Sequence, residues 1–107
     1  MLRTVLEMTV REGSEEEFRA AWLETARAAA LLPGSVAQTL LRDPSRPGTH
    51  LIMADWADRD ALEAFRSGPA RAELSARLEQ FRDSAHKRVL EALEHVTTDE
   101  NLGSDPA

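Results

Sequence analysis

Residues 49–56, THLIMADW, are the most apolar of the segments that resemble a β-strand in this sequence. Successive side chains of a strand point to opposite faces of a sheet. The even-numbered residues from His50 to Trp56, which include Ile52, therefore share one face, and Leu51 and Met53 share the other. Both faces are largely apolar, so a sheet built around this strand has two surfaces to bury.

Three other segments are predicted to be strands of the same sheet. Residues 2–10, LRTVLEMTV, are mostly aliphatic or β-branched and alternate loosely. Residues 35–42, SVAQTLLR, are separated from residues 49–56 by a stretch rich in turn-forming residues, which is typical of a hairpin with a longer loop. Residues 86–96, HKRVLEALEHV, are compatible with helix or strand, and we assign a strand because the predicted element order otherwise lacks one.

Helices are predicted between these strands. Ser14 and Glu17 have the spacing of a capping box, and an apolar stripe at helical spacing follows them until Pro33 and the next glycine end the helix. Asp58 can cap a short helix, and Pro69 suits the first turn of another. The helical region after the third strand is therefore split in two.

The resulting order, β-α-β-β-α-β, predicts an α+β fold of the ferredoxin-like class, with an antiparallel sheet and helices on one of its faces. The helices can cover only one of the two apolar faces. We therefore expect a homodimer formed through the open sheet face, which produces a dimeric α+β barrel.

Composition limits the class of protein. The chain has 107 residues, a net charge of −6, no cysteine and no tyrosine. These features argue against disulfides, thiolate metal sites and nucleic acid as a partner. The absence of a signal-like or membrane-length apolar run predicts a cytoplasmic protein that does not bind membranes. We expect one domain over residues 1–96 and a disordered acidic tail over residues 97–107.

Several short motifs, in this order, resemble the antibiotic biosynthesis monooxygenase family of dimeric α+β barrels. The resemblance covers residues 2–96, and its strongest part is the segment DWADRDA at the end of the third strand. The other matching motifs are Arg11-Glu12-Gly13, Glu16-Glu17-Phe18, Pro33-Gly34, Leu41-Arg42-Asp43 and Ser67-Gly68-Pro69.

The resemblance implies a function and a mechanism. Some members of the family oxygenate aromatic polyketide phenols without metal or flavin, by deprotonating the substrate and letting the resulting anion reduce dioxygen. The expected protein is therefore a cofactor-independent monooxygenase that acts on a polycyclic aromatic metabolite. The alternative is a dimeric module of the same fold that binds a ligand, or supports a partner enzyme, without catalysis.

The functional residues of the polyketide oxygenases are mostly replaced here. Their asparagine and the tyrosine that follows it correspond to Ile52 and Met53. A later aromatic hydroxyl corresponds to Leu62, and an arginine to Ser75, so Trp56 alone matches.

The haem-degrading members provide a third comparison. Their first-strand asparagine, helix-end tryptophan and haem-ligating histidine correspond to Leu6, Phe65 and Ser75. Because no ligand for the iron is conserved at these positions, haem binding is the least favoured of the three functions.

His50 and Trp56 are the candidate catalytic residues. A histidine on the helix-covered face could deprotonate a phenol near neutral pH, although a solvated histidine at a strand start is the more common arrangement. Trp56 could form a pocket wall for a flat aromatic ligand. Alternatively, it is a core tryptophan whose indole N–H binds a backbone carbonyl.

The remaining candidates would contact substrate. Gln38 and Arg42 are expected on the face of the second strand that also holds Val36. Arg42 could hold an anion or form an ion pair with Asp43 or Asp55. The other predicted substrate-binding residues are Trp22, Ile52, Phe65 and Ser75, and no metal site or cofactor is predicted.

Overall fold

The structure is a computed structural model that describes residues 1–98 of the chain. It contains four strands and three helices in the predicted order, with the second helical region split. The elements are β1 (Leu2–Val10), α1 (Glu15–Ala29), β2 (Ser35–Arg42), β3 (Thr49–Trp56), α2 (Arg59–Arg66), α3 (Pro69–Glu79) and β4 (Arg82–Glu91).

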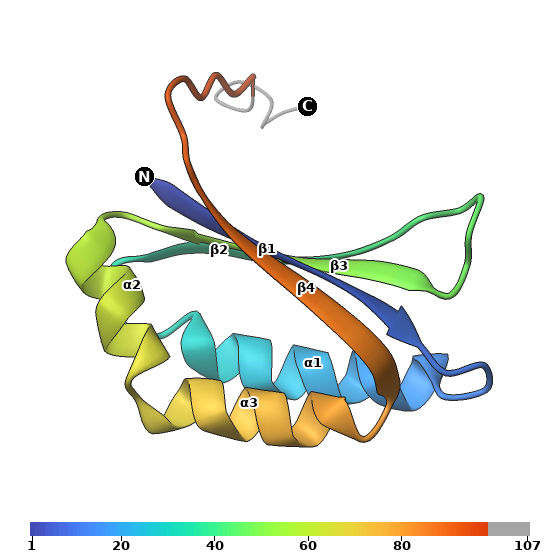
Figure 1. The fold of residues 1–107 in the computed structure, drawn as a ribbon. Coiled ribbons are helices and arrows are strands. Elements are labelled where there is room, and N and C mark those ends of the chain that lie inside the picture. The colour runs from blue at the N-terminus through green and yellow to red at the C-terminus, as the bar shows by residue number, and fades with distance from the viewer. Residues whose placement is uncertain (99–107) are drawn as a thin grey trace.

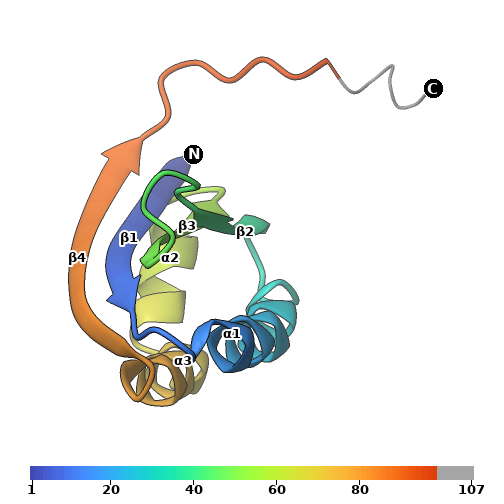
Figure 2. The same cartoon turned by 90° about the vertical axis from the view of Figure 1, so that its right-hand side faces the viewer.

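The four strands form one antiparallel sheet in the order β2-β3-β1-β4. All three helices lie on the same side of it, with α1 and α3 side by side and α2 at one end (Figure 1). The sheet curves around this side, and β4 sweeps down toward α3 (Figure 2). The predicted ferredoxin-like α+β class is confirmed.

Strand register determines which side chains share a face. Ile52 pairs with Leu6 of β1 and Leu40 of β2, and these residues lie on the helix-covered face. Met53 pairs with Val5 on the opposite, open face. The sheet therefore has only one layer of helices. Its open face has an apolar centre, as the sequence predicts, but it also carries the charged residues Arg3, Glu7 and Asp55.

The buried core divides into two clusters along the helix-covered face. One lies beneath α1 and the other beneath α2. The first is made of Met8, Val10, Phe18, Ala21, Trp22, Ala26, Ile52 and Leu78. The second is made of Leu2, Ala54, Trp56 and Leu62, with Phe65 and Val89 packed against it.

A close backbone approach sets the position of α2. Gly34 has a φ of +83°, a conformation that glycine adopts without strain. A Cβ atom at Gly34 would overlap the Cβ of Ala61, so the glycine also allows α2 to pack against the end of the α1–β2 turn. The Ala57 amide donates to the Gly34 carbonyl at 2.8 Å, which fixes this contact.

The start of α1 differs from the prediction. Ser14 is the N-cap residue, but its side chain makes no capping hydrogen bond. Its φ and ψ, −105° and 4°, lie outside the extended region from which a cap side chain normally reaches forward. The Glu15 carboxylate instead accepts from the Gly13 amide at 3.0 Å. The helix also ends at Ala29, before Pro33, because short-range bonds tighten the chain after that residue.

The last strand was predicted too late in the sequence. β4 begins at Arg82 and ends at Glu91, whereas residues 86–96 were predicted. It is an edge strand held by backbone pairing along β1, so its polar first residues give little hydrophobic signal. The domain boundary at residue 96 stays a prediction, and most of the predicted tail, residues 97–107, lies outside the described residues.

One further expectation fails in β2. The register shifts between Ser35 and Ala37, and Val36 within this irregularity is 55% exposed rather than covered by helices. Gln38 and Leu40 keep the predicted alternation. Among the helices of residues 1–98, none has both the length and the hydropathy needed to cross a membrane.

Candidate functional site

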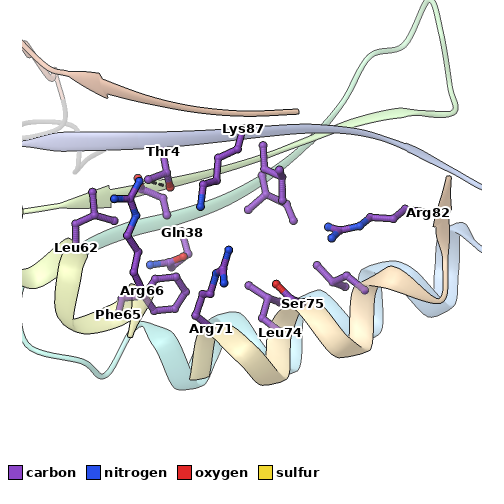
Figure 3. Close-up of a pocket in the computed structure, with 14 residues that line it drawn as sticks. Thr4, Gln38, Leu62, Phe65, Arg66, Arg71, Leu74, Ser75, Arg82 and Lys87 are labelled. Atoms are coloured by element: carbon purple, nitrogen blue, oxygen red, sulfur yellow. Dashed lines mark hydrogen bonds between the residues drawn. The ribbon is translucent and has the colours of Figure 1, made fainter. Parts of the chain in front are cut away.

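A pocket of about 250 Å³ lies on the helix-covered face, between the sheet and the α2–α3 pair (Figure 3). It is open to solvent on one side, and each of the four strands contributes to its wall. The lining residues are Thr4, Leu6, Gln38, Ile52, Ala54, Leu62, Phe65, Arg66, Arg71, Leu74, Ser75, Leu78, Arg82 and Lys87.

The helices α2 and α3 supply much of the apolar wall of the pocket. Asp58 caps α2 by accepting from the Ala61 amide at 2.9 Å, which orients Leu62 and Phe65 toward the sheet. The helix breaks at Ser67 and Gly68, and α3 then begins at Pro69, as predicted. The break lets α3 run beneath the sheet as a second wall (Figure 1).

Trp56 lies behind this wall and does not line the pocket. Its side chain is fully buried and stacks on Phe65, with ring centroids 4.9 Å apart and an interplanar angle of 28°. The indole Nε1 has no hydrogen-bond partner among the described residues, so the expected bond to a backbone carbonyl does not form. Trp56 therefore contacts the pocket indirectly, through lining residues such as Phe65.

Among residues 1–98, four cationic side chains line the pocket, whereas no aspartate or glutamate does. Arg66 and Arg82 each have a nearby carboxylate, since Arg66 lies 3.1 Å from Glu63 and Arg82 lies 3.9 Å from Glu79. The remaining two come from opposite walls, Arg71 from α3 and Lys87 from β4. Figure 3 shows these two side chains pointing toward one another across the pocket.

The charge of this pocket acts on Lys87. Partial burial lowers the pKa of Lys87 from its ordinary value, and the positive charges of Arg71 and Arg66 lower it further. Glu63 acts in the opposite direction, but its effect on this pKa is the smallest of the four causes. The pocket is therefore an environment that disfavours additional positive charge and favours an anion.

His50 lies in a different hollow of the same sheet face. This hollow is lined by Glu15, Arg19, Leu40, Leu41, Arg42 and His50. The imidazole is buried, contacts the Phe18 ring edge-on at a centroid distance of 5.4 Å, and its Nδ1 lies 3.3 Å from the Gly48 carbonyl oxygen. His50 and Trp56 are thus at opposite ends of β3 and share no cavity.

The structure brings four of the predicted substrate-binding residues together in the pocket, namely Gln38, Ile52, Phe65 and Ser75. Trp22 packs in the core beneath α1 instead. Arg42 lines the hollow of His50, and its two expected acidic partners, Asp43 and Asp55, pair with other arginines.

The substrate-binding residues predicted from the sequence include none of the four cationic residues of the pocket, Arg66, Arg71, Arg82 and Lys87. The misplaced start of the last strand hid Lys87, because its position in the β1–β4 ladder was not known. Register pairs Lys87 with Leu6, which lies on the helix-covered face. The alternation of Ala85, Lys87 and Val89 was the available signal.

Residues 1–98 contain no group of three histidine, aspartate or glutamate side chains placed to hold a metal ion. The pocket instead offers an amide at Gln38, hydroxyls at Thr4 and Ser75, and the four cations. Such a site can bind an apolar molecule, orient a polar substituent and stabilise negative charge.

Several solved structures have the same fold as this chain. SnoaB, a cofactor-independent oxygenase from Streptomyces nogalater, is 25% identical; the match covers 91% of this chain and 97% of that one, with a TM-score of 0.79. A Caulobacter crescentus protein is 21% identical over 87% of this chain and 90% of its own, with a TM-score of 0.79. A Deinococcus radiodurans protein is 18% identical over 92% and 98%, with a TM-score of 0.80.

Among curated protein sequences, none matches this chain. The family model described as antibiotic biosynthesis monooxygenase matches residues 1–77, which reach from β1 into α3 and include most of the pocket. A match over this much of the chain, together with the shared architecture, shows that the protein belongs to the antibiotic biosynthesis monooxygenase family.

Proposed function

We propose that the protein is a cofactor-independent monooxygenase that oxidises a polycyclic aromatic metabolite in the pocket beneath α2 and α3. The observation that carries the proposal is the combination, in one open cavity, of an apolar wall that includes Phe65 and four cationic side chains. The 25% identity to SnoaB, a cofactor-independent oxygenase, supports the same reaction type.

The reaction balances without an external reductant. A phenol or anthrone loses a proton, and the electron-rich anion transfers an electron to dioxygen. Combination of the two radicals and protonation give a peroxide. Loss of water then leaves a carbonyl, so one oxygen atom enters the product and the other becomes water. The positive pocket favours the first step because it stabilises the anion relative to the neutral substrate.

The individual residues have proposed roles in this step. Phe65 and Ile52 would contact the ring system, and Gln38 and Ser75 would orient its oxygen substituents. Trp56 would act through Phe65 as a positioning residue. His50 remains the proposed base, but it would have to act from the neighbouring hollow rather than from inside the pocket.

Oxygen consumption with an anthrone substrate tests the function. We expect uptake above the protein-free rate, with no added metal or flavin, and one carbonyl product for each dioxygen consumed. If His50 is the base, His50→Ala should slow turnover by about 100-fold or more. Retention of turnover by that variant would remove the base role and leave the pocket reaction in place, whereas no uptake by the wild-type protein would contradict the function.

A ligand-binding module without catalysis is the second candidate. It is favoured by the replacement of the expected asparagine, tyrosine and arginine by Ile52, Met53 and Ser75. The same experiment distinguishes the two, because the module would bind a planar aromatic probe and raise the melting temperature without consuming oxygen.

A second copy of the chain is the proposed partner of the open sheet face. That face carries Leu41 and Leu90, which are 42% and 44% exposed, and Val5 and Met53 lie between them on the central strands. The bidentate Arg3–Asp55 pair, at 2.7 and 3.0 Å, neutralises two of the charges of this face, which also carries Glu7 and Arg88. Exposed leucines around an apolar centre suit a sheet-to-sheet homodimer.

Light scattering tests the dimer. We expect twice the chain mass of 11.9 kDa for the wild-type protein and a shift toward the monomer for Leu41→Arg. Leu31→Arg is the matched control, since Leu31 is exposed but lies in the turn after α1. A monomeric wild-type protein would contradict this assembly.

A further inference from the structure

The positive charge of the pocket stands out in an acidic protein. Arg66, Arg71, Arg82 and Lys87 line the cavity, and the part of the chain that the structure describes adds no acidic lining residue, although the whole chain has a net charge of −6. We propose that the pocket selects an organic anion, an apolar molecule whose carboxylate lies between Arg71 and Lys87. This names the substrate class and rests on the pocket assigned above, but it does not depend on the oxygen chemistry.

The four cations are not equivalent. Arg66 and Arg82 already lie within 4.0 Å of Glu63 and Glu79. Within residues 1–98, Arg71 and Lys87 have no carboxylate at that distance. Their charged groups enter the pocket from opposite walls and face one another (Figure 3). The point between them is therefore the place where a ligand anion meets two cations without displacing an existing ion pair.

Electrostatics favours a ligand that arrives charged. Two facing cations with no carboxylate within 4.0 Å repel each other, and this repulsion contributes to the lowered pKa of Lys87. A neutral ligand leaves the repulsion in place for as long as it is bound. A carboxylate removes it, because the planar guanidinium of Arg71 can donate two parallel hydrogen bonds and the Lys87 ammonium a third.

The surroundings favour a carboxylate over a phosphate. Helix N-termini and nests of backbone amides are the usual phosphate sites. Here α3 begins with Pro69, which has no amide hydrogen, and the Gly68 amide donates to the Phe65 carbonyl. The two charged groups that face one another are side chains, and they lie in the same pocket as the apolar side chains of Leu6, Leu74 and Leu78. This combination suits a single carboxylate on a large apolar body.

Calorimetric titration with matched probes tests the proposal. The probes are an anthraquinone carboxylate and the corresponding neutral carboxamide, which have the same rings and nearly the same shape. At low salt we expect the wild-type protein to bind the carboxylate about tenfold more tightly. Arg71→Gln and Lys87→Gln should each reduce this preference to about threefold or less.

Arg27→Gln is the control variant. Arg27 is exposed near the end of α1 and does not line the pocket, yet its loss changes the net charge by the same amount. We expect it to keep the preference within about twofold of the wild-type value. Circular dichroism and melting curves establish that all three variants are folded.

Three results would overturn the proposal. They are equal affinity of the wild-type protein for both probes, an equal loss of preference in Arg27→Gln and Arg71→Gln, and tighter binding of the matching phosphonate than of the carboxylate. Because binding is measured without turnover, its failure is distinguishable from failure of the proposed oxygenation. If the protein oxidises a neutral anthrone but shows no preference for the charged probe, the proposed oxygenation stands and the proposed selection of an anion is contradicted.

Discussion

The two ends of β3 have similar aromatic contacts but different surroundings. At the start of the strand, His50 meets Phe18 edge-on beneath α1. At its end, Trp56 stacks on Phe65 beneath α2. Phe18 is fully buried in the core, whereas Phe65 is half-buried and lines the open pocket.

This difference separates stability from ligand binding along a single strand. The α1 end holds the larger core cluster, because a long helix packs its apolar stripe directly on the sheet, and the hollow of His50 lies beside it. The α2 end remains open because the helical region is split, and α3 carries cations and a serine at the surface that faces the sheet. Substitutions at the two ends should therefore have different effects.

The largest expected effect is the loss of Phe18. Phe18→Ala should lower the free energy of unfolding by about 3–5 kcal/mol, because it leaves a cavity between α1 and the sheet. Urea denaturation measures this change. The affinity of the folded fraction for the anthraquinone carboxylate should stay the same, and a selective loss of binding would contradict the separation of the two ends.

The second largest effect is expected at Phe65, where a substitution should change both stability and ligand affinity. Phe65→Ala should lower the free energy of unfolding by only about 1–3 kcal/mol, since the ring is half-buried, and it also removes the stack on Trp56. The same variant should weaken binding of the anthraquinone carboxylate by about threefold to tenfold. Unfolding and titration experiments on one preparation give both numbers, and a stability loss with unchanged affinity would show that Phe65 is only a core residue.

The third effect concerns space rather than packing. Ser75→Trp should place an indole in the pocket and weaken probe binding by about tenfold or more, with little loss of stability because the site is open. Arg42→Trp is the matched change in the hollow of His50 and should alter affinity by less than about twofold. The reverse ranking would place the ligand at His50.

The contrast between the two ends also explains what the sequence could predict. Residues 35–42 and 49–56 were predicted with their observed bounds because strong turn residues delimit both strands. β4 was misplaced because an edge strand is held by backbone pairing, which leaves little trace in side-chain hydropathy.

The site could likewise be predicted only in part from the sequence. Alternation along β3 correctly placed His50 and Ile52 on one face, but a shared face does not specify which helix covers each residue. The turn after α2 determines where α3 runs, and this tertiary arrangement separates His50 from the pocket. Lys87 was missed because its position in the β1–β4 ladder depends on a register that the sequence alone does not provide.

The smallest expected effect is the change in melting temperature on replacing Lys87, and its sign tests the charge of the pocket. The pKa of Lys87 is lower in the folded chain than its ordinary value of 10.5, so the folded protein holds this proton less tightly than the unfolded one. The charged lysine therefore opposes folding below its folded pKa, and this cost disappears as the pH rises through that pKa to 10.5. Lys87→Gln should raise the melting temperature of the ligand-free protein at neutral pH by about 2–4 °C at most.

Calorimetric melting at neutral pH and at about pH 11 checks the sign, because the advantage of Lys87→Gln should vanish where the wild-type lysine is neutral in both states. Arg27→Gln should show no comparable pH dependence, since an arginine stays charged throughout this range. With saturating anthraquinone carboxylate at neutral pH, the order should invert, because Lys87 then contributes to ligand binding and the variant gains less from it. If Lys87→Gln melts at a lower temperature than the wild-type protein both with and without ligand, the Lys87 side chain contributes to stability by packing. The α2 end of β3 would then be a structural region like the α1 end, and its cations would not mark a binding site.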